Sequence, residues 1–217
     1  MTKSKIFIVD DHPLVREWLT TLIDQTTDLV VCDGAEDAQG ALKGIARSSP
    51  DLAIIDLSLR GESGIDLIRT IGEKYPKVAM VVLSMHDERA YAERSIRAGA
   101  RGYIMKSEST KKVVDAIHQV LQGNVYLSKE LTELFAHKFI SGSGGDSSPI
   151  SQLSDREMEV FRFIGQGYET REISETLKVN IKTVQTYCTR IKEKLNLSSG
   201  AELLREAIRW NDTSVVR

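Results

Sequence analysis

The sequence contains little cysteine and no long apolar segment. Its two cysteines, Cys32 and Cys188, have no metal-ligand spacing around them, so the pattern of a disulfide scaffold or a zinc site is missing. No run of about eighteen apolar residues is present, and the first residues lack the apolar core and cleavage site of a signal peptide. We therefore expect a reduced, cytoplasmic protein that contacts no membrane.

A strong excess of either charge is also missing. The net charge is −2 and charged residues make up 28% of the 217 residues, which is typical of a globular protein and unlike a disordered one. The local exception is residues 178–194, which carry five basic residues and one acidic residue. A basic helix of this kind fits a small nucleic-acid contact surface, although a solvated helix face can have the same composition.

The first 120 residues alternate short apolar runs with helical patterns. The apolar runs cover residues 6–9, 29–32, 52–55, 78–83 and 102–105, and the helical patterns cover residues 14–23, 38–46, 65–71, 88–98 and 109–121. Short, continuously apolar strands separated by helices predict a parallel sheet that is covered on both faces. The expected fold of this part is therefore α/β and doubly wound, with a five-stranded parallel sheet.

Polar residues follow four of these strands at the point where each strand ends. They are Asp10, Asp11, Asp56, Ser84 and Lys106. In an open parallel sheet, ligands bind at the carboxyl edge of the strands. Each residue alone would be read as a turn, cap or surface residue, but five of them at one edge indicate a binding site.

The residue types indicate phosphoryl chemistry. Three neighbouring carboxylates repel one another, so the site needs a cation. Oxygen ligands favour a hard ion, and Mg²⁺ suits a site with few protein ligands plus water and phosphate. A carboxylate such as Asp56 can attack a phosphoryl group, while Lys106 adds a second positive charge and the Ser84 hydroxyl can donate to a phosphoryl oxygen.

Four segments carry a resemblance to the receiver domain of two-component response regulators. They are Ile8-Val9-Asp10-Asp11-His12, residues 54–64, Val82-Leu83-Ser84 and Gly102-Tyr103-Ile104-Met105-Lys106. The resemblance spans about residues 4–121 and implies a flavodoxin-like fold. It implies that Asp56 accepts phosphate from a histidine kinase. It also implies that Asp11, Asp56 and the backbone carbonyl of Ser58 bind Mg²⁺, with Asp10 acting partly through water.

The same resemblance assigns a conformational switch to Ser84 and Tyr103. The hydroxyl would turn toward the phosphate while the aromatic ring swings inward. Met85 stands where relatives usually have a small residue, so we predict slow self-dephosphorylation and no other enzymatic activity.

The remaining sequence predicts a linker and a second, all-helical domain. We place the receiver at residues 1–122, a linker at 123–148 that is helical over about 127–139 and rich in Gly and Ser over 141–148, and the second domain at 149–217. Ser154 and Glu157 form a capping box at the start of the first of four expected helices. These helices cover about residues 154–166, 170–177, 181–194 and 200–210.

The second and third of these helices form a helix-turn-helix in which the third is the basic one. Its core face leaves a set of polar residues outward: Lys182, Thr183, Gln185, Thr186, Thr189 and Arg190. Gln185 can pair with adenine, and the threonines can contact thymine methyl groups. Lys182, Arg190 and Lys194 suit phosphates, which position a protein without specifying a sequence.

Residues 149–212 resemble the LuxR-type helix-turn-helix. The resemblance is carried by Leu153-Ser154-Asp155-Arg156-Glu157, Gly167, Glu172-Ile173-Ser174 and Thr183-Val184. Together the two resemblances point to the NarL/FixJ subfamily. They imply base contacts from Gln185, Thr186 and Thr189, and a homodimer that forms on phosphorylation or on DNA. Gln185 and Tyr187 depart from the usual Lys and His, so the DNA sequence preference of relatives does not transfer.

Three alternatives remain at this point. A phosphohydrolase also uses an aspartyl phosphate, but its nucleophile usually lies in an Asp-x-Asp motif after the first strand, whereas Asp56 follows the third. A DNA-binding protein with a vestigial pocket would lack some of the acids or the lysine. A protein-interaction module would use the helical domain without contacting DNA.

Overall fold

The computed structural model describes residues 2–59, 62–86, 88–140 and 149–215. The chain forms two compact units, Met1–His137 and Lys138–Arg217. The Gly- and Ser-rich part of the predicted linker, residues 141–148, lies outside the described residues, and the predicted boundaries at 122 and 149 stay predictions. Within the described ranges, no helix combines the length and apolar character that a membrane span requires.

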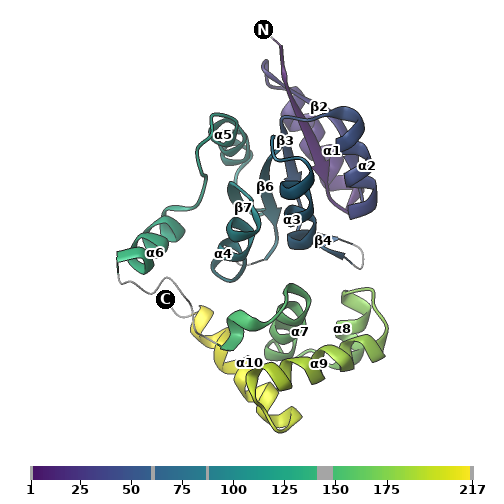
Figure 1. The fold of residues 1–217 in the computed structure, drawn as a ribbon, viewed down its shortest axis with the longest axis vertical. Helices are drawn as coiled ribbons and strands as arrows, with labels where there is room; N and C mark the ends of the chain where they lie inside the picture. Colours follow the sequence, from purple (N-terminus) through teal and green to yellow (C-terminus); the bar gives the residue numbers. More distant parts are fainter. Residues whose placement is uncertain (1, 60–61, 87, 141–148, 216–217) are drawn as a thin grey trace. The chain divides into compact units, whose positions relative to one another are not determined.

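The first unit contains a five-stranded sheet in the order β2-β1-β3-β6-β7 (Figure 1). Its strands are β1 (Ser4–Val9), β2 (Leu29–Ala35), β3 (Leu52–Ile55), β6 (Ala79–Ser84) and β7 (Gly102–Met105). Every pair of neighbouring strands is parallel. The predicted doubly wound, flavodoxin-like fold is confirmed, because this order places the first strand between the second and the third.

Five helices connect and cover the strands. They are α1 (Pro13–Asp24), α2 (Ala38–Ser48), α3 (Gly64–Lys74), α4 (Glu88–Ala98) and α5 (Thr110–Leu121). Side chains of α1 and α5 share one core with the sheet, including Leu19, Ile54 and Ile117. On the opposite face the Phe7 ring packs directly against Gly44 of α2. Both faces of the sheet are therefore buried, which explains why its strands read as continuous apolar runs.

Two features of this unit have no counterpart among the predicted elements. The chain after Asp56 forms a small antiparallel hairpin, β4 (Ser58–Leu59) with β5 (Glu62–Ser63). The chain after α5 returns to the sheet, where Tyr126 forms a parallel bridge with Gly102 at the free edge of β7. The predicted helix in the linker is present as α6 (Lys129–Ile140).

The second unit is all-helical, as predicted. A 3₁₀ turn, η1 (Pro149–Gln152), precedes α7 (Asp155–Gly165), α8 (Thr170–Thr176), α9 (Ile181–Leu195) and α10 (Gly200–Val215). The capping box is confirmed, because the Ser154 hydroxyl accepts from the Glu157 N–H and the Glu157 carboxylate accepts from the Ser154 N–H. Buried Phe161, Val184 and Leu203 come from α7, α9 and α10, three helices that contact one another.

Gly64, the first residue of α3, packs closely against the backbone of Asp56 and Leu57. A Cβ placed there would lie 2.3 Å from the Asp56 carbonyl oxygen and 2.5 Å from the Leu57 Cα. We expect Gly64→Ala to lower the free energy of unfolding by about 1–3 kcal/mol, because backbone atoms next to Asp56 must move. Thermal or denaturant unfolding followed by circular dichroism measures this change.

Gly72, on the same helix, is the matched control. A Cβ there would meet its nearest neighbour, the Met80 methyl group, at 3.7 Å. Gly72→Ala should be neutral or stabilising by up to about 1 kcal/mol, since alanine favours a helix interior over glycine. Equal effects of the two substitutions would contradict the proposed close approach at Gly64.

Candidate functional site

The strand order brings the predicted acidic residues to one edge of the sheet. Asp10 and Asp11 follow β1, and Asp56 follows the adjacent β3, where its backbone N–H donates to the Val9 carbonyl at 2.8 Å. All three aspartates are buried, with exposures between 2% and 6%. Asp10, Asp11 and Asp56, together with His12, offer ligand atoms that lie within 4.8 Å of one another. The predicted convergence is therefore present in the structure.

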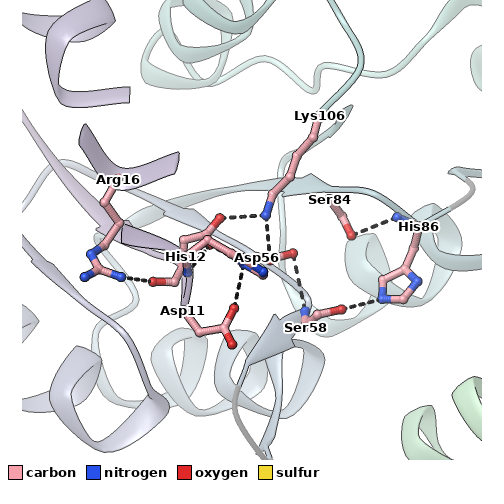
Figure 2. A network of polar contacts seen from close by, with 9 residues as sticks. Asp11, His12, Arg16, Asp56, Ser58, Ser84, His86 and Lys106 are labelled. Carbon is pink, nitrogen blue, oxygen red and sulfur yellow. Dashed lines mark hydrogen bonds and ion pairs between the residues drawn. The ribbon is translucent and has the colours of Figure 1, made fainter. Parts of the chain in front are cut away.

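Lys106 enters this cluster from the end of β7 (Figure 2). Its Nζ lies 2.7 Å from Asp10 Oδ2 and 2.7 Å from Asp56 Oδ2. Its side chain is only 9% exposed, so the lysine bridges two carboxylates with little water around it. A buried charge is stable only when it is paired in this way.

The pKa values of Asp56 and Lys106 show how the two groups depend on each other. Burial raises the pKa of Asp56 above its usual value, although the charge and hydrogen bond of Lys106 act in the opposite direction. For Lys106, burial alone would lower the pKa, but Asp56 and Asp10 outweigh it and the pKa is raised. Lys106 is therefore a permanent cation, and it helps Asp56 to remain an anion at neutral pH.

The charge balance of the cluster fits a divalent cation. Three buried carboxylates face one lysine, which leaves two negative charges uncompensated when all three are ionised. Oxygen-rich ligands of this kind suit Mg²⁺. Ser58, whose carbonyl is the remaining predicted ligand, is positioned next to the cluster because its N–H donates to Asp56 Oδ1 at 3.3 Å. The donor set is thus compatible with the predicted magnesium site.

His12 is a member of the cluster that the sequence did not single out. Its Nδ1 lies 2.8 Å from Asp11 Oδ1 and 3.2 Å from Asp10 Oδ1, while its side chain remains 62% exposed. A histidine directly after two aspartates was the only signal in the sequence. Arg16, one turn further along, donates to the Asp10 carbonyl at 2.6 Å and holds the start of this loop.

Ser84 and Tyr103 lie beside the cluster and are joined by the loop after β6. The Ser84 hydroxyl oxygen accepts from the His86 N–H at 3.1 Å, and the Tyr103 hydroxyl donates to the His86 carbonyl at 2.9 Å. Tyr103 is 1% exposed, so its ring is in the inward position. The His86 ring shares a 2.7 Å hydrogen bond with the Ser58 hydroxyl, a contact that the sequence did not reveal (Figure 2).

Helix α9 presents most of the residues that were predicted to face outward. The exposed ones are Lys182, Gln185, Thr186, Thr189 and Arg190, whereas Thr183 is partly buried. Positions 182, 185, 186 and 189 follow the spacing of one helix face. The Thr186 and Thr189 hydroxyls donate to carbonyls one turn earlier, and this orients their methyl groups on the helix surface.

The side chain of Lys194, another predicted DNA contact, pairs with residues outside α9. Its Nζ lies 2.6 Å from Glu157 Oε2 and 3.2 Å from the Gln152 carbonyl oxygen. Burial would raise the pKa of Glu157, but hydrogen bonds from Lys194 and Ser154 outweigh it and the pKa is lowered. The contact ties the end of α9 to the start of α7, so Lys194 stabilises the helical unit.

Comparison with known proteins identifies both parts of the chain. The family described as "Response regulator receiver domain" matches residues 6–118. The family described as "Bacterial regulatory proteins, luxR family" matches residues 151–207. The oxygen regulatory protein NreC of Staphylococcus carnosus is 35% identical over 210 residues, which cover 94% of this chain and 97% of NreC.

Solved structures give the same result. A LuxR-family two-component response regulator from Aurantimonas sp. SI85-9A1 is 32% identical, with a TM-score of 0.60, over 64% of this chain and 99% of that one. RcsB from Salmonella enterica serovar Typhimurium, bound to promoter rprA in the presence of phosphomimetic BeF₃⁻, is 25% identical, with a TM-score of 0.61. That match covers 94% of this chain and 98% of RcsB.

Replacing the bridging lysine tests the electrostatics of the cluster. Lys106→Met should raise the pKa of Asp56 further, because it removes the charge and hydrogen bond that lower this pKa. Asp56 would then ionise at higher pH than in the unmodified chain. Carboxyl ¹³C NMR titration in metal-free buffer measures the pKa. Lys112→Met is the control, since Lys112, on α5, pairs with Glu108 and not with the cluster. An unchanged Asp56 pKa in Lys106→Met would refute this account.

Proposed function

The chain belongs to the response regulators that join a receiver domain to a LuxR-family DNA-binding domain, and on this premise we propose that phosphorylation of Asp56 controls its binding to promoter DNA. The main support for this proposal is the buried cluster in which Lys106 Nζ lies 2.7 Å from a carboxylate oxygen of Asp10 and 2.7 Å from one of Asp56. Asp56 combines a carboxylate nucleophile with a neighbouring fixed cation, which is what phosphoryl transfer requires. The phosphodonor is a cognate histidine kinase in the cytoplasm.

Each residue of the cluster has a separate part in the transfer. An oxygen of the ionised Asp56 attacks phosphorus, and the bond between phosphorus and the kinase histidine breaks. Lys106 remains charged because its pKa is raised, so it can bind a phosphoryl oxygen without losing its proton. Because burial raises the pKa of Asp56, the fraction of reactive carboxylate depends on Lys106 staying in place.

Asp11, Asp56 and the Ser58 carbonyl would hold Mg²⁺, and Asp10 would act partly through water. When bound, the ion neutralises charge on the transferring phosphoryl oxygens. The support is the set of buried carboxylates within 4.8 Å and the position of Ser58 beside them.

Phosphorylation acts on the output through the switch residues. The Ser84 hydroxyl turns toward the phosphoryl group and raises the population of chains in which Tyr103 is inward, the position that it has in the structure. Chains with the ring inward present a different surface of α4, β7 and α5 from chains with the ring outward. Chains with this surface dimerise. A dimer places two copies of α9 about one DNA turn apart, or ~34 Å. The two-fold arrangement matches half-sites in a promoter.

On DNA, α9 is the reading helix. Gln185, Thr186 and Thr189 contact base edges, and Lys182, Thr183 and Arg190 contact the backbone or neighbouring bases. The exposure of all of these residues except the partly buried Thr183 supports this role. Lys194 contributes through its ion pair with Glu157, which holds α9 in place, and secondarily through its charge near phosphates.

The chain is not an enzyme in the usual sense, because its only reactions are acceptance of a phosphoryl group on Asp56 and its slow loss. Met85 adjoins the switch hydroxyl and is 69% exposed, so its mobile side chain can cover the approach of water.

Phosphorylation with acetyl phosphate and Mg²⁺ tests the acceptor. We expect the intact chain to gain the mass of one phosphoryl group and to self-associate, and we expect Asp56→Ala to do neither. Intact-mass spectrometry and sedimentation velocity measure the two responses. Asp24→Asn is the control, because Asp24 is an exposed aspartate at the end of α1, outside the proposed dimerisation surface, and the amide oxygen can still accept from the Val31 N–H. This variant should behave like the unmodified chain. Phosphorylation of Asp56→Ala at the same level would show that another residue is the acceptor.

Substitutions on α9 distinguish contacts to DNA bases from contacts to DNA phosphates. We would use a duplex selected from a random-sequence pool by the phosphorylated chain. Gln185→Ala should weaken binding by about 1–3 kcal/mol and relax the preference at one base pair, whereas Lys182→Ala should weaken all sequences alike and reduce the salt slope by about one. Fluorescence anisotropy over a range of salt concentrations measures both. Lys43→Ala on α2 is the control, and identical behaviour of the two α9 variants would contradict these roles.

A further inference from the structure

His86 occupies a singular position between the phosphorylation site and the switch residues. It lies in the loop after β6, is 8% exposed, and belongs to none of the roles described above. Its backbone N–H donates to the Ser84 hydroxyl oxygen, and its backbone carbonyl accepts from the Tyr103 hydroxyl. One residue thus contacts both members of the proposed switch pair.

The side chain of His86 extends the same connection in two further directions. Its Nε2 lies 2.7 Å from the hydroxyl oxygen of Ser58, the residue whose carbonyl is a proposed metal ligand (Figure 2). Its ring stacks on Tyr91 of α4, with centroids 4.7 Å apart and planes inclined by 29°. Tyr91 is itself 1% exposed. The imidazole is therefore fixed between the loop after Asp56 and the first turns of α4.

We propose that His86 is a positioning residue that transmits occupancy of the phosphorylation site to Tyr103 and α4. The Ser58–His86 hydrogen bond is the step that carries the displacement. The His86 ring contacts Ser58 and Tyr91, and its backbone contacts Ser84 and Tyr103. A displacement of His86 at one of these contacts therefore also displaces the others. Phosphorylation of Asp56 acts on two of these contacts, Ser58 and Ser84, and the response appears at the other two.

This inference rests on the proposed phosphorylation of Asp56 and adds a path by which that event reaches the output surface. It differs from a purely local role of Ser84, because the hydrogen bond from Ser58 provides a second, independent connection. A packed, hydrogen-bonded group with several fixed partners is the kind of element that passes a small displacement on.

Hydrogen–deuterium exchange of α4, residues 88–98, tests the proposal in the full-length chain. The measured quantity is the ratio between the exchange rates of α4 with and without acetyl phosphate and Mg²⁺. His86→Phe preserves the stack on Tyr91 and the backbone contacts but removes the hydrogen bond to Ser58. We expect intact-mass spectrometry to show that this variant is still phosphorylated. Its exchange ratio should be closer to one than that of the unmodified chain, by a factor of up to about five, which corresponds to the loss of one hydrogen bond.

Four further variants keep the test decisive. Ser58→Ala retains the backbone carbonyl and should give the same defect, and the double variant should be no worse than either single one. His86→Gln, whose amide can still bond Ser58, should restore most of the response. His118→Phe, which removes a histidine hydrogen bond between α5 and Asp28 but none of the His86 contacts, should leave the α4 exchange ratio as it is in the unmodified chain.

The outcomes separate this inference from the function on which it depends. The role of His86 would be overturned if His86→Phe or Ser58→Ala had the same exchange ratio as the unmodified chain. It would also be overturned if the two effects added in the double variant. Failure of the unmodified chain to gain a phosphoryl group would instead overturn the proposed acceptor.

Discussion

The buried bridge from Lys106 to Asp10 and Asp56 is the interaction on which the first unit depends. Removing a charge from water is costly, and pairing with an opposite charge offsets this cost for the buried lysine and carboxylates. The bridge spans the sheet from β1 and β3 to β7, and it can form only when the strands lie in the observed order. The fold therefore fixes the electrostatics of the site, and the site in turn joins strands that are distant in the sequence.

The same principle holds in the helical unit on a smaller scale. Glu157 accepts from the Ser154 N–H at the start of α7 and pairs with Lys194 near the end of α9. A carboxylate that serves as a helix cap thereby also fixes α9 against its neighbour. The orientation of the residues exposed on α9 follows from this contact and from the burial of Val184 and Ile191 on its inner face.

Much of this arrangement could be predicted because it follows from chain-local rules. Continuous apolar runs define buried parallel strands, and the carboxyl ends of such strands share an edge, so Asp56 and Lys106 could be placed together from the sequence. The Ser58–His86 contact could not, because it joins two loops whose paths depend on packing. Lys194 shows the same limit, since helical spacing places it on a surface but does not reveal a partner 37 residues away.

The return of the chain to the sheet at Tyr126 has a practical consequence. Its N–H donates to the Arg101 carbonyl and its carbonyl accepts from the Tyr103 N–H, so it occupies main-chain groups at the open edge of β7. Uncovered strand edges invite pairing with other molecules. A fragment that stops after α5 would expose this edge and could associate in ways that the intact chain does not. Isolated receivers should therefore be cut beyond α6, where the segment that shields β7 is retained.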